Sequence, residues 1–216
     1  MKGSKMIHLK KPAFTMLELV FVIVVLGILA AMAIPRMDRD LRQGAKDNIL
    51  AAIRFTQHLA LVDNKTDPTD PNWQRKLWTI RFSDASDNLA TFYTVSSDAD
   101  ASGTIIKNET AIDPTDGKFM YNANADTTIG DDESPNIFIG KHYGISTMSF
   151  AGGCSAAQKH IAFDHLGRPH NGVETATNDY GTYMTTDCNI TIAFIDTSIT
   201  PLTITVASET GYASGD

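Results

Sequence analysis

The chain has 216 residues, of which 43% are hydrophobic and 20% are charged, and this ordinary composition excludes wholesale disorder. The length indicates one main globular domain with appendages. There are 18 basic residues against 25 acidic ones, a formal net charge of −7. Because an acidic chain repels a phosphate backbone, direct nucleic-acid binding is not expected.

Residues 1–13 form a basic leader that contains no acidic residue and four lysines, namely Lys2, Lys5, Lys10 and Lys11. Removing this leader lowers the basic residues from 18 to 14 and takes the net charge from −7 to −11. Lysines that directly precede an apolar segment favour a cytoplasmic N-terminus and an exported C-terminus.

The segment 14–35 is apolar. Its 22 residues include one charged side chain, that of Glu18, and about 20 apolar residues suffice to span a bilayer. An ordinary secretory signal peptide has an apolar stretch of about 7–15 residues before a small-x-small cleavage site, and Ala31-Met32-Ala33 has that form. The longer run and the carboxylate within it favour a retained membrane-spanning helix.

The end of the leader carries a family resemblance. The run Lys10-Lys11-Pro12-Ala13-Phe14-Thr15-Met16-Leu17-Glu18 resembles the processing motif of type IV pilins and type II secretion pseudopilins. The resemblance implies that a prepilin peptidase cuts between Ala13 and Phe14 and methylates the new Phe14 amine. The family usually has Gly where Ala13 stands, and Ala is small enough for processing to survive.

The resemblance also implies a function. The processed chain would be a structural subunit, a minor pseudopilin or pilin-like protein, of a type II secretion pseudopilus or a type IV pilus or competence filament. It would cross the bacterial inner membrane once, with its head in the periplasm, and then join other subunits. Glu18 of one subunit would neutralise the Phe14 amine of a neighbour and set the register of packed helices. The alternative for Glu18 is a carboxylate that snorkels to the interface.

Residues 36–62 are predicted to continue the helix in amphipathic form, with a kink at Pro35. The apolar or small residues recur at helical spacing and should pack against the head. They are Met37, Leu41, Ala45, Ile49, Ala52, Ile53, Thr56 and Ala60.

Residues 63–71 contain two prolines and several turn formers, so they should end the helix and begin the head, 63–216. Short β-favouring runs follow, and alternation such as Ile190, Ile192 and Phe194 indicates an antiparallel sheet with one buried face. The sequence therefore predicts an α+β, pilin-like fold, a long N-terminal helix packed on an antiparallel β-rich head. The expected strands are 77–82, 89–95, 136–139, 145–150, 160–163, 189–195 and 202–206.

One stretch of the head, 98–109, follows the pattern of a calcium-binding EF-hand loop. The candidate ligands are Asp98, Asp100, Ser102, the Thr104 carbonyl and Glu109, around the turn residue Gly103. A solvated acidic turn is the alternative interpretation. A degenerate copy of the same loop pattern runs from Asn122 through Asn124 and Asp126 to Glu133, and Thr127 replaces the turn glycine there. We expect that copy to be a turn.

Cys154 and Cys188 are the two cysteines of the chain. In an exported protein such a pair usually forms a disulfide, and two free buried thiols are the alternative. His160, His165 and His170 recur every five residues, a spacing that fits no common zinc pattern. No GxSxG or HExxH motif organises a catalytic site, so an enzyme is not predicted.

The C-terminal part carries a weaker resemblance. Residues 161–169, the strand 204–206 and residues 209–212 are similar to the head of H-type minor pseudopilins and FimT-like proteins. Some of these relatives bind DNA through arginines near the final glycine, and this chain has Tyr-Ala-Ser-Gly-Asp there instead. The rival reading for the whole chain is a secreted or membrane-tethered periplasmic binding protein with an ordinary signal sequence.

Overall fold

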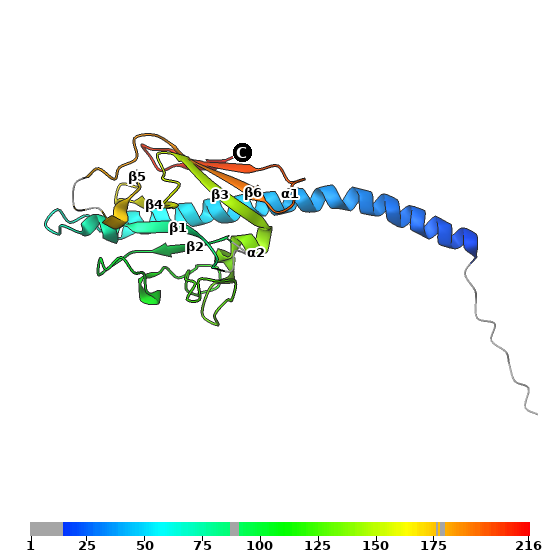
Figure 1. The fold of residues 1–216 in the computed structure, drawn as a ribbon, viewed down its shortest axis with the longest axis horizontal. Coiled ribbons are helices and arrows are strands. Elements are labelled where there is room, and N and C mark those ends of the chain that lie inside the picture. The colour runs from blue at the N-terminus through cyan, green and yellow to red at the C-terminus, as the bar shows by residue number, and fades with distance from the viewer. Residues whose placement is uncertain (1–14, 87–90, 176, 178–179) are drawn as a thin grey trace, which may run out of the picture. The chain divides into compact units, whose positions relative to one another are not determined.

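The computed structural model describes residues 15–216 except 87–90, 176 and 178–179, and it does not describe the side chains of residues 31–39. The chain divides into two compact units, Met1–Arg39 and Asp40–Asp216. The fold is α+β, with few helices and two antiparallel sheets, as the sequence predicts at this coarser level (Figure 1).

The helix α1 spans Met16–Val62. Thr15 caps it, because the Thr15 hydroxyl and carbonyl oxygens both accept from the Glu18 N–H, at 3.3 and 3.1 Å. The helix ends where the turn-rich residues 63–71 begin, as predicted. In the parts of the chain that are described, no helix combines the length and the apolar character that a membrane crossing requires. The side chain of Pro35 lies outside the described residues.

The second half of α1 buries the predicted stripe. Ile49 and Ile53 are fully buried, as is the Thr56 side chain, whose hydroxyl donates to the Ala52 carbonyl at 2.8 Å. Leu41 is 37% exposed, and Met37 lies outside the described side chains. The buried members of the stripe are Ala45, Ile49, Ala52, Ile53, Thr56 and Ala60.

The first sheet has the strand order β2-β1-β4-β5. Its strands are β1 (Trp78–Asp84), β2 (Thr91–Ser96), β4 (His160–Phe163) and β5 (Pro169–His170). The residues of β4 are all buried, which indicates that neither face of this strand is open to solvent.

The second sheet has the order β3-β6-β7-β8. Along β6 and β7 buried apolar residues alternate with more exposed threonines and asparagine, so one face is buried as the sequence predicts. Its strands are β3 (Ile145–Gly152), β6 (Cys188–Phe194), β7 (Leu202–Val206) and β8 (Ala213–Gly215).

The predicted strand 136–139 is wrong. The region forms a 3₁₀ helix, Pro135–Ile137, followed by the short helix α2, Ile139–Tyr143. The Ser134 side chain caps the first of these by accepting from the Asn136 N–H at 3.2 Å, and Gly144 ends α2 in the left-handed conformation. These caps outweigh the β propensity of the intervening Ile and Phe.

The second half of α1 is tied to both sheets by one side chain. The Gln57 amide donates to the Gly167 carbonyl at 2.8 Å and to the Thr210 carbonyl at 2.9 Å. Gly211 makes this contact possible, because a Cβ there would lie 2.3 Å from the Gly167 oxygen. The turn that contains Gly167 and the turn that contains Thr210 thus meet at the helix.

Candidate functional site

The residues of the processing motif lie at the start of the described chain. Ala13 and Phe14 lie outside the described residues, so the cleavage and methylation site stays a prediction. Glu18 lies in the first turn of α1. The large apolar side chains that follow it are exposed, from Phe21 at 69% to Val25 at 37%.

The loop 98–109 is organised around its carboxylates. The Asp98 carboxylate accepts from the N–H groups of Ser102 and Gly103, at 3.0 and 2.9 Å. Gly103 has a φ of +81°, a conformation that favours glycine, and Ala101 has a φ of +55°. The loop therefore curls around its first residue, as the EF-hand pattern requires.

The three acidic residues of this loop converge. Ligand atoms of Asp98, Asp100 and Glu109 lie within 4.8 Å of one another. Burial raises the pKa of Asp98, and hydrogen bonds from Ser102 lower the pKa of Asp100. The two carboxylates therefore have pKa values shifted in opposite directions, Asp98 by burial and Asp100 by hydrogen bonding.

The other two predicted ligands lie in the same turn. The Ser102 hydroxyl lies 3.2 Å from the Thr104 carbonyl oxygen and donates to it. All five oxygen donors proposed from the sequence are thus brought into one loop, and together they match the hard-oxygen chemistry of Ca²⁺. The acidic triad could hold a metal ion, and the triad alone does not identify that ion.

A cavity of about 340 Å³ lies beside this loop. Its floor is the outer face of β1 and β2, where Arg81 forms an ion pair with Glu174. Behind this pair the ring of His160 is fully buried, and its Nδ1 lies 3.7 Å from the Glu174 carboxylate. Sequence reasoning missed this cluster, because it depends on the pairing of β1 with β4 across a long stretch of chain.

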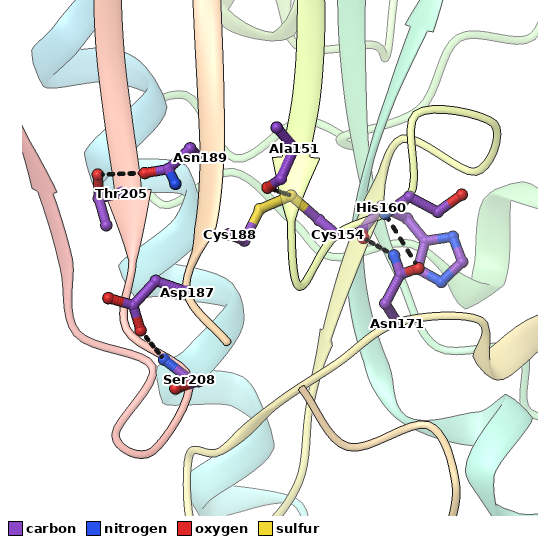
Figure 2. Close-up of a disulfide and its surroundings, with 10 residues drawn as sticks. Ala151, Cys154, His160, Asn171, Asp187, Cys188, Asn189, Thr205 and Ser208 are labelled. Atoms are coloured by element: carbon purple, nitrogen blue, oxygen red, sulfur yellow. Dashed lines mark hydrogen bonds between the residues drawn. A yellow bond between two sulfur atoms is a disulfide. The ribbon is translucent and has the colours of Figure 1, made fainter. Parts of the chain in front are cut away.

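The predicted disulfide joins Cys154 to Cys188, with an S–S distance of 2.05 Å. Figure 2 shows it linking the loop after β3 to the first residue of β6, beside the Asp187 carboxylate that accepts from the Ser208 N–H at 2.9 Å. Gly152 and Gly153 precede it, and a Cβ on Gly152 would lie 2.0 Å from the Asp187 carbonyl oxygen. The close approach of the backbone at Gly152 to the Asp187 carbonyl therefore requires glycine at position 152.

The three spaced histidines do not form a site. The His170 ring is buried between the Thr182 hydroxyl at 2.9 Å and the Asp164 carboxylate at 3.4 Å. His165 lies 2.9 Å from the Thr66 hydroxyl instead. Among the described residues, the acidic triad is the one cluster of His, Cys, Asp and Glu side chains close enough to hold a metal ion.

Comparison of the chain with protein-family models, curated proteins and solved structures found no match.

Proposed function

We propose that this chain is a structural subunit, a minor pseudopilin or pilin-like protein, of a type II secretion pseudopilus or a type IV pilus or competence filament. The observation that carries the proposal is the contrast within α1. Residues 16–30 expose apolar side chains all around the helix, whereas the second half buries one stripe in the head. Apolar surface of that extent is unfavourable in water. Lipid and the helices of other subunits would cover it.

The processing motif supplies the chemistry of assembly. A prepilin peptidase would cut between Ala13 and Phe14 and methylate the Phe14 amine. The mature chain would be anchored in the inner membrane, with its head in the periplasm. Because an isolated ammonium or carboxylate is costly in an apolar environment, Phe14 of one subunit and Glu18 of the next would pair. The pair would set the axial register, and the action of the protein would be assembly and not turnover.

The first experiment is the mass of the mature N-terminal peptide from the membrane fraction of the native host. A peptide that begins at N-methyl-Phe14 is expected. A chain that begins at Ile34 would contradict the proposal and support the rival, a secreted binding protein released by signal peptidase after Ala33. An uncut chain that retains residues 1–13 would contradict processing and support a membrane-tethered protein.

We also propose that the loop 98–109 binds Ca²⁺ and thereby stiffens the head. The convergence of Asp98, Asp100 and Glu109 supports this, since a divalent cation would neutralise three carboxylates held close together. The full chain in detergent should melt at a higher temperature with Ca²⁺ than with chelator. Glu109→Gln should abolish the shift, and Glu209→Gln, at an exposed position outside the loop, should preserve it. An unchanged melting temperature of the unmodified protein would remove the calcium assignment.

A further inference from the structure

Two stretches of the head share a twelve-residue pattern. Residues 98–109 read DADASGTIIKNE, and residues 122–133 read NANADTTIGDDE. Alanine occupies positions 2 and 4 of both, threonine position 7, isoleucine position 8 and glutamate position 12. The oxygen-bearing side chains also fall on positions 1, 3 and 5 in both stretches, where an EF-hand loop has its first ligands.

The two stretches have the same backbone design. The Glu109 carboxylate accepts hydrogen bonds from the backbone N–H groups at positions 2 and 9 of its own loop, with N···O distances of 2.9 and 3.1 Å. The Glu133 carboxylate accepts hydrogen bonds from the N–H groups at the same two positions of the second loop, at 2.7 and 2.8 Å. The alanine at position 4 has a positive φ in each, +55° for Ala101 and +54° for Ala125. The second stretch is therefore a structural repeat of the first.

The repeats differ in how the first residue is held. In the first loop, the Asp98 carboxylate accepts N–H groups from Ser102 and from Gly103. In the second loop, the Asn122 amide Nδ2 donates to the Asp126 carbonyl at 2.9 Å. The Asn122 Nδ2 is therefore paired within the loop, and its Oδ1 takes no part in that bond.

An independent observation indicates that a ligand belongs at this oxygen. Asn122 is only 7% exposed. Its Oδ1 is buried and has no hydrogen-bond partner among the described residues. A buried polar atom without a partner carries a desolvation cost. A cation bound in the loop would satisfy this oxygen and remove that cost.

We propose that residues 122–133 hold a second calcium ion. The ligands would be the side-chain oxygens of Asn122 and Asn124, the carboxylates of Asp126 and Glu133, and the Thr128 carbonyl. Every donor is a hard oxygen, which Ca²⁺ prefers. The second loop has two acidic ligands where the first has three, and affinity rises with ligand charge. The second site is therefore the weaker of the two.

The two sites are mechanically linked. The Lys107 ammonium, from the first loop, donates to both carboxylate oxygens of Asp132 in the second, each at 2.9 Å. The Tyr121 hydroxyl, which directly precedes the second loop, lies 3.5 Å from the Ile105 carbonyl oxygen. Binding of an ion in one loop would restrain the other, so a tandem calcium module would stiffen this edge of the head.

Calorimetric titration of the full chain in detergent with CaCl₂ tests the proposal. The unmodified protein should bind two ions, the weaker with a dissociation constant of about 10⁻⁴–10⁻³ M. Asn122→Asp adds a third acidic ligand to the second loop and should tighten the weaker site about tenfold. Asn189→Asp adds the same charge on the exposed face of β6 and should leave both sites unchanged.

Two further variants separate this proposal from the calcium assignment of the first loop. Glu109→Gln should remove one ion and leave the weaker one. Glu133→Gln should do the reverse. If the unmodified protein binds a single ion and only Glu133→Gln loses it, the second site is supported and the first is contradicted. The second site would be overturned by the following result. The unmodified protein and Asn122→Asp each bind at most one calcium ion, and Glu133→Gln does not change the number of ions bound. None of these outcomes depends on filament assembly.

Discussion

The two halves of α1 are one continuous helix in which the same residue type has opposite surroundings. Ile23 in the first half is 58% exposed, whereas Ile53 in the second half is fully buried. The difference follows from the spacing of polar residues and not from hydrophobicity itself. A helix that is apolar all around needs cover from lipid or other chains, and an amphipathic helix finds its cover in its own domain. The two halves should therefore respond to different experiments.

The largest expected effect separates assembly from folding. Glu18→Ala should still be processed but should fail to enter filaments, because the Phe14 amine of the neighbouring subunit loses its counter-charge. The thermal unfolding of the head should not change. Filaments sheared from cells and probed for the subunit measure this. Glu209→Ala, at an exposed position of the head, is the control, and normal incorporation of Glu18→Ala would remove the register role.

A matched pair of isoleucines tests the comparison directly. Ile53→Ala should lower the free energy of unfolding by about 2–5 kcal/mol, since it opens a cavity in the core. Ile23→Ala should change it by less than about 0.5 kcal/mol, because its side chain is exposed. Urea unfolding followed by the fluorescence of Trp73 and Trp78 measures both. Equal changes in the free energy of unfolding would contradict the difference proposed between the two halves of α1.

The disulfide should stabilise only the unit that contains the second half of α1. Cys154 and Cys188 are 34 residues apart, and a closed loop of that length is worth about 3–4 kcal/mol in the chain-entropy model. The double variant Cys154→Ala, Cys188→Ala should lose about that much, measured by urea unfolding. A reducing agent should reproduce the loss in the unmodified protein and have no effect on the double variant.

The last expected effect is a pH dependence of stability, with a slope of at most about 1.4 kcal/mol per pH unit, that comes from one buried histidine. Burial and the neighbouring Arg81 lower the pKa of His160 to about 4, against about 6.5 when unfolded. The folded protein binds fewer protons between these values, so the contribution is complete above pH 6.5 and is lost as the pH falls towards 4.

Urea unfolding at several pH values measures this slope. His160→Gln should reduce it, because the amide does not titrate, and Gln keeps an acceptor for the Gly172 N–H that the ring nitrogen now accepts at 3.1 Å. His58→Gln, at an exposed helix position, should leave the slope unchanged. A slope that His160→Gln does not alter would show that other groups carry the acid sensitivity.

Local pattern was sufficient for much of the fold. The three- and four-residue spacing of Ile49, Ile53 and Thr56 predicted which face of α1 is buried, and the alternation along β6 and β7 predicted one buried sheet face. The expectation that the chain is exported predicted the Cys154–Cys188 disulfide. In the stretch 98–109, Asp98, Asp100 and Glu109 of the five predicted ligands converge, and the calcium ligation itself stays a prediction. Each of these follows from backbone geometry over a few residues, which the sequence displays directly.

Tertiary structure alone decided the rest. Strands β1 and β4 are paired across a long stretch of chain, and that pairing brings Arg81, His160 and Glu174 together. A short stretch of sequence also does not predict the close approach of Gly211 to Gly167. Nor does it predict that the Asn122 Oδ1 has no hydrogen-bond partner among the described residues. Periodicity reports which face of an element is buried. It does not report what lies against that face, because the partner is chosen by packing between distant segments.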